Sequence, residues 1–157
     1  TLELFIFESD PFVPSAKTLP RVFLSYRKDD YYDGWHLPGG YLGANETNRT
    51  AIRRIVRREL GARPRTIQCV FTLNRPNNIR EHQYSGFFAV TLVKAPRLQK
   101  GSLEYFSPSQ LPPKLIPYYR KTFTLFKKIH TFSRTLPKNR QRKFLEVLNI
   151  CEISGKV

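Results

Sequence analysis

Acidic residues, cysteine and long apolar runs are all scarce in this sequence. It has 12 Asp and Glu residues against 27 Lys and Arg residues, and its only cysteines are Cys69 and Cys151. Two cysteines are too few for a disulfide framework or a cysteine metal cluster. No apolar run approaches the roughly 20 residues that a membrane-spanning helix needs. These absences predict a protein without a membrane span, in a reducing and cytoplasmic setting.

The composition that remains is that of one globular domain. The chain has 157 residues, of which 40% are hydrophobic and 13% aromatic, so a disordered or collagen-like chain is excluded. This length can bury one sizeable core but not two ordinary ones. The segment 2–7 alternates and lacks a basic flank, which predicts a strand and not a signal peptide. We expect a single domain over residues 1–157, with its core over about 2–133 and a basic C-terminal extension over about 134–157.

Positive charge is concentrated in the C-terminal third. Residues 1–93 have 13 Lys and Arg against 9 Asp and Glu, a net charge of +4, whereas residues 94–157 have 14 against 3, a net charge of +11. A basic segment of this kind favours anionic partners such as nucleotides, RNA or membrane headgroups. A solvated basic face without a specific partner explains the same charge, so both interpretations stay open.

The periodicity of apolar residues predicts alternating strands and helices. Period-two patterns predict strands at 2–8, 21–27, 66–73 and 82–94, with a short strand at 35–40 that runs into a glycine pair. Three- and four-residue spacing predicts helices at 47–60 and 118–132. The segment 106–113 is typical of a turn-rich connection, and a short element is expected at 144–150. This order predicts an α/β (α+β) fold in which a mixed sheet is packed between helices, as α/β/α layers.

The predicted helix at 47–60 carries the most informative spacing. Gly40 is followed by five residues and Glu46, then by seven residues and Arg54, and Glu59 and Gly61 follow on the same helix. This pattern resembles the Nudix box of the MutT-like Nudix hydrolases, G-x5-E-x7-R-E-U-x-E-E-x-G-U, where U is aliphatic. The segments 35–39 and 104–112 also resemble family sequences, so that the resemblance covers about residues 2–130.

The resemblance implies a Nudix fold and hydrolysis of a nucleoside diphosphate that is linked to another moiety. It also implies a divalent cation, Mg²⁺ or Mn²⁺, which binds oxygen ligands, screens the phosphates and lowers the pKa of the attacking water. Gly40, Glu46 and Gly61 would be structural residues of the box. Many family members form homodimers, but no feature of this sequence decides that question.

Two of the three clustered box carboxylates are missing. Their positions hold Ile55 and Arg58, and only Glu59 remains. The formal charge of the cluster therefore changes from −3 to 0, and a cation 4–6 Å away would oppose metal binding, since at about 4 Å two unit charges interact by roughly 1 kcal/mol even in water. The residues argue against a conventional multi-metal site, and Ile55 is expected only to pack.

The depleted box is similar to that of the GDP-mannose mannosyl hydrolases, a subgroup that acts on a nucleotide sugar with one cation. Carried over to this sequence, the resemblance implies that Glu59 and the Gly39 carbonyl bind the metal. It implies that Arg27 contacts the diphosphate and that Arg54 orients nearby acids. The subgroup's base histidine has no counterpart in the matching segment 98–102.

The remaining candidates are weighed from their residue types. A histidine suits proton transfer near neutral pH, and His82 at the start of a predicted strand is preferred over His36 as the base, with no catalytic role expected for His130. Tyr41, Trp35 or Tyr84 could stack a nucleobase or simply pack. A salt bridge between Glu46 and Arg54 is expected to fix the loop to the helix.

A second function is compatible with the same residues. A Nudix-fold protein that has lost or weakened catalysis could bind a nucleotide or RNA through its positive charge. Arg58 could then contact phosphate directly, because a guanidinium group binds phosphate through paired hydrogen bonds. The alternative reading of Arg58 is a solvated helix face.

Overall fold

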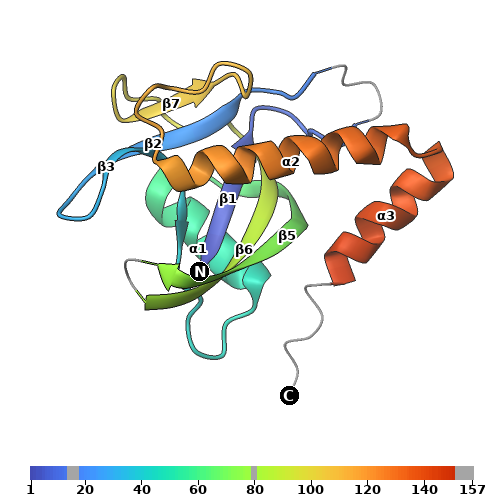
Figure 1. Cartoon of the computed structure of the whole chain (residues 1–157), viewed down its shortest axis with the longest axis horizontal. Coiled ribbons are helices and arrows are strands. Elements are labelled where there is room, and N and C mark those ends of the chain that lie inside the picture. Colours follow the sequence, from blue (N-terminus) through green and yellow to red (C-terminus); the bar gives the residue numbers. More distant parts are fainter. Residues whose placement is uncertain (14–17, 79–80, 151–157) are drawn as a thin grey trace.

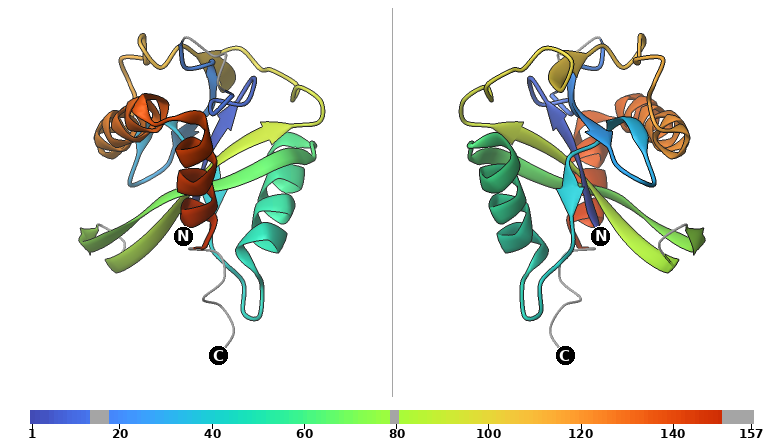
Figure 2. Two further views of the ribbon diagram at one scale, coloured as in Figure 1. Left: turned by 90° about the vertical axis from the view of Figure 1, so that its right-hand side faces the viewer. Right: turned by 90° about the vertical axis from the view of Figure 1, so that its left-hand side faces the viewer.

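Two helices enclose a mixed β-sheet, one on each of its faces. The computed structural model describes residues 1–13, 18–78 and 81–150, and the side chains of these residues except 75–78, 81–83 and 148–150. The elements, in chain order, are β1 (Leu2–Phe7), β2 (Val22–Lys28), β3 (Asp33–His36), β4 (Gly39–Gly40), α1 (Asn48–Leu60), β5 (Pro64–Asn78), β6 (Glu81–Leu92), β7 (Leu103–Phe106), α2 (Pro117–Thr135) and α3 (Lys138–Ile150). Figure 1 and Figure 2 show α1 and α2 on opposite sides of the sheet. The predicted layering is confirmed.

The sheet divides at its centre, and this division creates the space for the site. The strands have the order β3-β2-β1-β6-β5, with the β1–β6 pair parallel. β1 pairs with β2 only through Ile6 and Phe7. Toward its N-terminus β1 pairs instead with β4, where Leu2 lies opposite Gly40 and Glu3 opposite Gly39. The strands β1 and β2 therefore diverge from a shared end.

Alternation along β1 divides the core into two clusters. Phe5 and Phe7 face α2, and Leu2, Leu4 and Ile6 face α1. On the α2 side the ring centroid of Phe5 lies 4.6 Å from that of Phe126 and 5.1 Å from that of Phe123. Because successive strand residues point to opposite faces, one strand supplies apolar surface to both helices.

Helix α1 has clear signals at both ends. The Thr47 side chain accepts a hydrogen bond from the Thr50 N–H at its start. Gly61, with a φ of 59°, ends it in the left-handed region, where glycine is free of the steric penalty of a Cβ. Its buried face consists of Ala51, Ile52, Ile55 and Val56. The expectation that Ile55 packs in the core is confirmed.

Three predictions need correction, and one strand was not predicted. The short strand expected at 35–40 is divided into β3 and β4, which pair with β2 and β1 respectively. The segment 103–106 is a strand, β7, which pairs with β2 before the turn-rich connection begins. The element expected at 144–150 is a helix that begins at Lys138, within the basic stretch. The β5–β6 hairpin also extends further than predicted, to Asn78 and Glu81. Apolar periodicity is weak in both β7 and α3, because β7 has only four residues and the first six residues of α3 are polar or basic.

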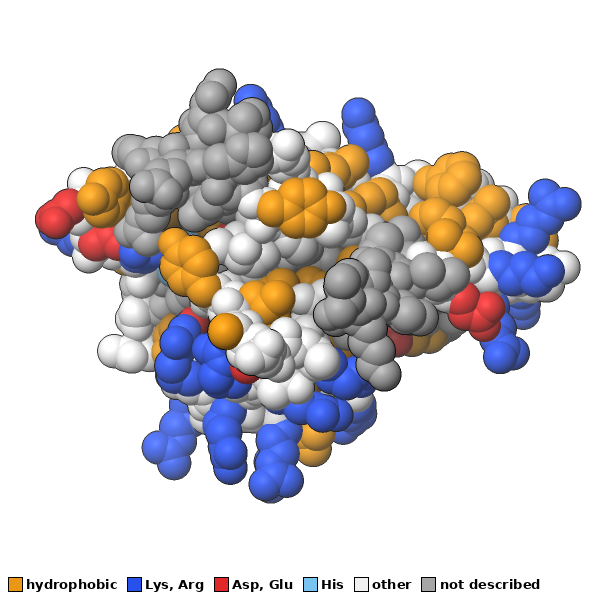
Figure 3. Space-filling model, turned by 90° about the horizontal axis from the view of Figure 1, so that it is seen from below, with side chains coloured by type: hydrophobic (Ala, Val, Ile, Leu, Met, Phe, Trp, Pro, Cys, Tyr) orange, Lys and Arg blue, Asp and Glu red, His pale blue; other side chains and the backbone are white. Residues whose placement is uncertain are grey.

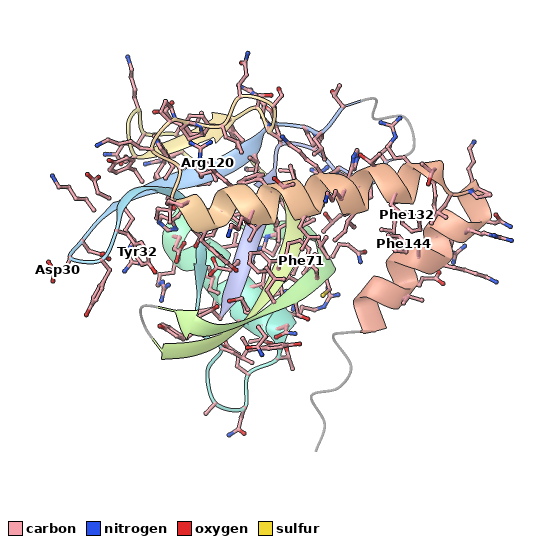
Figure 4. The ribbon with its side chains drawn as sticks, viewed as in Figure 1. Asp30, Tyr32, Phe71, Arg120, Phe132 and Phe144 are labelled. Atoms are coloured by element: carbon pink, nitrogen blue, oxygen red, sulfur yellow. The ribbon has the colours of Figure 1, made fainter. Side chains whose placement is uncertain are left out.

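Helix α3 turns back from α2 and lies along β5. The Gln68 side chain donates a hydrogen bond of 3.0 Å to the Leu145 carbonyl, and the rings of Phe132 and Phe144 meet edge to face with centroids 5.6 Å apart (Figure 4).

Among the described residues no helix combines the length and the apolar character that crossing a bilayer requires.

Phe126→Ala should lower the free energy of unfolding by about 3–5 kcal/mol, because it removes a fully buried ring from the aromatic cluster that Phe5, Phe7, Phe123 and Phe126 form on the α2 side of the sheet. The matched control is Phe132→Ala on the same helix, whose ring is 53% exposed and whose loss should cost about 1 kcal/mol. Urea unfolding of both variants measures the difference. Equal losses would show that the aromatic cluster is not the centre of the core.

Candidate functional site

A cavity of about 990 Å³ lies where β1 and β2 diverge. Its charged lining consists of the cations Arg27, Arg54, Arg58 and Lys121 and the carboxylates Glu3 and Glu59. With both carboxylates ionised, cations are in excess by two. Gly39, Gly40 and Tyr41 form part of the same wall. The cavity thus gathers most of the residues that the sequence singled out, and its charge suits an anionic ligand.

Glu46 and Arg54 join the loop after β4 to helix α1. Arg54 donates two parallel hydrogen bonds to the Glu46 carboxylate, of 2.8 and 2.6 Å, and a third of 3.0 Å to the Tyr41 carbonyl. The Gly43 N–H also donates to Glu46. The hydrogen bonds from Arg54 and then from Gly43 lower the pKa of Glu46 to about 2. The salt bridge expected from the sequence is present, and it shapes the loop.

Gly39 brings β4 against β1 at a point where no side chain would fit. A Cβ at this position would lie 2.5 Å from the Leu2 carbonyl oxygen and 2.9 Å from Glu3 Oε2. A Cβ at Gly40 would lie 3.3 Å from Ile55 Cδ1 and 3.6 Å from Arg58 Nη2. The glycine pair therefore permits the close approach of three elements, and it leaves its backbone exposed to the cavity.

Glu59 lies between the glycine strand and Arg58. Its carboxylate accepts a hydrogen bond of 2.9 Å from Arg58 Nη2, and its side chain is 27% exposed. Burial raises the pKa of Glu59, while the Arg58 guanidinium and the Gly39 backbone N–H act in the opposite direction. The structure thus brings the two predicted metal ligands, Gly39 and Glu59, to the same place. It also puts a cation directly on the carboxylate.

The described side chains contain no group of three His, Cys, Asp or Glu residues that could hold a metal ion. A preformed, closed metal site is therefore absent from that part of the chain. Mg²⁺ is commonly held by one or two carboxylates together with substrate phosphates, and it keeps several waters. Glu59 could supply such a carboxylate to a cation that binds together with a phosphate ligand, and Gly39, whose N–H lies at Glu59, borders the same cavity.

Glu3 is a cavity residue that the sequence reasoning missed. It is 7% exposed, and the Tyr119 hydroxyl donates a hydrogen bond of 3.1 Å to its Oε2. Glu3 shares a strand face with Phe5 and Phe7, which are fully buried. A carboxylate two and four residues before phenylalanines on the same strand face was the signal that could have found it. Lys121 was also missed, because a single lysine on a basic helix carries no such signal.

His36 is the histidine that the described structure places at the cavity. Its Nδ1 lies 2.7 Å from the Leu37 carbonyl and its Nε2 lies 3.3 Å from the Ser25 hydroxyl. Burial lowers its pKa, so a neutral ring that donates from Nδ1 and accepts at Nε2 fits both contacts. The side chain of His82, the preferred base, lies outside the described residues. His130 is buried elsewhere, where its Nε2 is 2.9 Å from the Pro11 carbonyl.

Of the residues predicted to contact the diphosphate or to stack on the nucleobase, Arg27 and Tyr41 line the cavity and Trp35 does not. Arg27 lines the cavity, forms an ion pair with Asp29 and lies 5.5 Å from the ring centroid of Tyr32. Tyr41 is 62% exposed at the cavity wall, which leaves its ring accessible for stacking. Trp35 is 8% exposed in the core, with its ring against Phe106, and is excluded as a stacking residue.

The comparisons with known proteins agree on one family. The family model of the NUDIX domain matches residues 15–126. A MutT NUDIX hydrolase from Burkholderia pseudomallei is 18% identical, with a TM-score of 0.60, and the match covers 78% of this chain and 95% of that one. The NUDIX domain of Shewanella oneidensis NrtR, complexed with ADP ribose, is 15% identical with a TM-score of 0.60, over 81% and 84%.

A NUDIX family hydrolase from Clostridium perfringens is 13% identical, with a TM-score of 0.57, and the match covers 83% of this chain and 95% of that one. No curated protein matches the chain. At these identities the structural matches establish the fold, and the family follows from the domain model.

Glu46→Gln should destabilise the protein in a pH-dependent way. The folded-state pKa of about 2 lies below the ordinary 4.5, so the stabilising effect of the ionised carboxylate is fully present above about pH 4.5 and is lost as the pH falls toward 2. Urea unfolding of wild type and variant should therefore differ most near neutral pH and converge at low pH. Glu146→Gln, in an exposed pair with Arg142, should have little effect throughout. A pH-independent difference for Glu46→Gln would contradict the assignment.

Proposed function

With a NUDIX domain over residues 15–126, the chain belongs to the Nudix family, and we propose that it hydrolyses a nucleoside diphosphate linked to another moiety, with one divalent cation. The observation that carries this proposal is the position of Glu59. The only box carboxylate left of the cluster lies beside the Gly39 backbone, at a cavity with an excess of cationic side chains. A nucleotide sugar is the proposed substrate class, because the depleted box is similar to that of the mannosyl hydrolase subgroup.

The cationic side chains of the cavity would bind the diphosphate. Lys121 is exposed and has no acidic partner among the described residues, so phosphate binding would break no ion pair there. Arg27 and Arg58 would each exchange a carboxylate for a phosphate oxygen. The exposed ring of Tyr41 would stack on the nucleobase. Arg54 is already held by Glu46, and its role would be to position the loop.

When bound, a cation at Glu59 would screen the phosphates, orient the leaving group and lower the pKa of the attacking water. Glu59 must be ionised and released from Arg58 to contribute to such a site. A phosphate that draws Arg58 away would therefore favour the cation, and the two ligands would bind cooperatively. A histidine would accept the proton, and His82 remains the proposed base, with His36 as the second candidate.

The ion pair between Arg58 and Glu59 also supports a second function. If Arg58 stays on Glu59, the remaining carboxylate is neutralised, and the cavity binds a nucleotide without turnover. Divalent cations would then leave the thermal stability unchanged, whereas the enzyme should gain stability from them.

A panel of nucleotide sugars and other nucleoside diphosphate derivatives, with Mg²⁺ and in ¹⁸O water, separates these functions. Products are identified by ³¹P NMR. Label on the sugar carbon supports the nucleotide sugar proposal, and label on phosphorus supports pyrophosphate hydrolysis. Nucleotide binding without turnover on any compound supports the second function.

Glu59→Gln should reduce turnover of the best substrate to its rate without cation, because the amide cannot replace a charged oxygen ligand. Its melting temperature should be unchanged or higher, since burial already disfavours the ionised form of Glu59. Glu146→Gln on α3, which is not part of the cavity lining, serves as the control and should keep full activity. Full activity of Glu59→Gln would refute the metal assignment.

Arg58→Gln should bind Mn²⁺ or Mg²⁺ more tightly than wild type when no nucleotide is present. Removal of a guanidinium about 4 Å from the metal relieves roughly 1 kcal/mol, a change of about fivefold in affinity. The same variant should bind a nucleoside diphosphate more weakly. Titration calorimetry measures both, and Arg57→Gln, which changes the net charge equally, is the control. Unchanged affinities for both ligands would show that Arg58 faces only solvent.

A further inference from the structure

Basic charge is not confined to the C-terminal third. Residues 47–100 contain twelve Lys and Arg residues and only two acidic residues, Glu59 and Glu81. Arg54 and Arg58 of this segment line the cavity, but most of the others do not. Seen from below, Lys and Arg side chains gather along one side of the molecule, where Asp and Glu are sparse (Figure 3).

Six exposed residues outside the cavity define a basic surface: Arg49, Arg53 and Arg57 on α1, Arg63 just before β5, Arg65 within β5, and Lys94 after β6. Two hydrogen bonds bring the segments together. The Val93 N–H donates to the Arg63 carbonyl, and the Arg65 guanidinium donates through Nη2 to the Val93 carbonyl. The Gly61 N–H donates to the Arg57 carbonyl, so the helix leads directly into β5.

The arginines on the two sides of α1 differ in whether they have a carboxylate partner. On the cavity side Arg54 and Arg58 each have a carboxylate partner. On the solvent side Arg53 and Arg57 make no ion pair or hydrogen bond with the described residues. Like charges four residues apart disfavour a helix, and a cation in the first turn, such as Arg49, opposes the helix dipole. No acidic residue in that turn compensates for it.

We propose that the basic surface binds the phosphate backbone of duplex nucleic acid, without reading its sequence. Arg49, Arg53 and Arg57 recur every four residues and form a row about 12 Å long. Each strand of a duplex has one phosphate about every 3.4 Å along the duplex axis, so a row laid along that axis spans about three to four phosphates of one strand. This binding goes beyond the proposed hydrolysis, because none of the six residues lines the cavity.

Two observations favour a duplex over other polyanions. The solvent face of α1 has no aromatic side chain, so it lacks the stacking platform that proteins use to bind unpaired bases. A membrane-surface helix inserts its apolar face into lipid, but the apolar face of α1 is buried in the core. Phosphate contacts alone remain, and a duplex presents twice as many phosphates per unit length of its axis as either of its strands.

The test compares two triple variants of the full chain with equal net charge. The first is Arg53→Gln, Arg57→Gln and Arg63→Gln in the basic surface. The control is Lys128→Gln, Lys138→Gln and Arg140→Gln, all exposed on α2 and α3. Fluorescence anisotropy with duplex DNA and duplex RNA of about 20 base pairs, from about 50 to 300 mM salt, gives affinity and salt dependence.

We expect the basic-surface variant to lose at least about tenfold in affinity, and its slope of log K against log salt to become shallower by about 2–3, near 0.9 per lost phosphate contact. The control should keep both values. The duplex that binds more tightly identifies RNA or DNA as the source. Circular dichroism and nucleoside diphosphate binding should match wild type in both variants, so a failure of the proposed hydrolysis would leave this test intact.

The remaining outcomes overturn the proposal. Equal losses in both variants would assign binding to net charge or to the C-terminal third. Tighter binding of a single strand, with the same loss in the basic-surface variant, would exclude the duplex. Binding only to vesicles of phosphatidylserine and phosphatidylcholine would assign the basic surface to lipid. No binding at the lowest salt would leave it as a solvated face.

Discussion

The close approach of Gly39 to β1 is the constraint on which the site depends. Only a residue without a Cβ fits between the Leu2 carbonyl and the Glu3 side chain, and this fit lets β4 take the place beside β1 that β2 leaves. The diverging strands then enclose the cavity, and the loop after β4 returns to α1 under the Glu46–Arg54 pair. A larger residue at position 39 would push β4 away and separate Glu59 from the glycine backbone.

Local patterns predicted the elements well because their causes are local. The apolar period of α1, Thr47 at its start and Gly61 at its end are all read within fifteen residues, and the box spacing identified Glu46 and Arg54 as partners. The sequence did not reveal contacts between distant segments. Glu3 meets Tyr119 across 116 positions, and Lys121 reaches the same cavity from another helix. Periodicity predicts whether a residue lies on the buried or the exposed face of its helix or strand. It does not predict which residue of another element packs against it.

The thirteen residues of helix α1 place arginines in two different electrostatic environments. On its inner side each arginine is held by a carboxylate, which fixes the geometry and keeps the local charge low. On its outer side Arg53 and Arg57, four residues apart, repel one another and make no ion pair with the described residues. The buried stripe of Ala51, Ile52, Ile55 and Val56 holds the helix in place against that repulsion. The loss of a box carboxylate to Ile55 therefore adds to this apolar anchor.

The parallel pairing of β1 with β6 has a consequence for the order of folding. Residues 2–7 find their partners at 86–91, so more than half of the chain must be available before the central strand is flanked on both sides. Closing a loop of that length precedes any gain from the contacts it permits, which makes such pairings slow. Helix α1 and the β5–β6 hairpin join neighbouring segments and can form early. We expect the cavity to be among the last features to assemble, so that a chain stalled before this step would have its helix and hairpin but no place for a ligand.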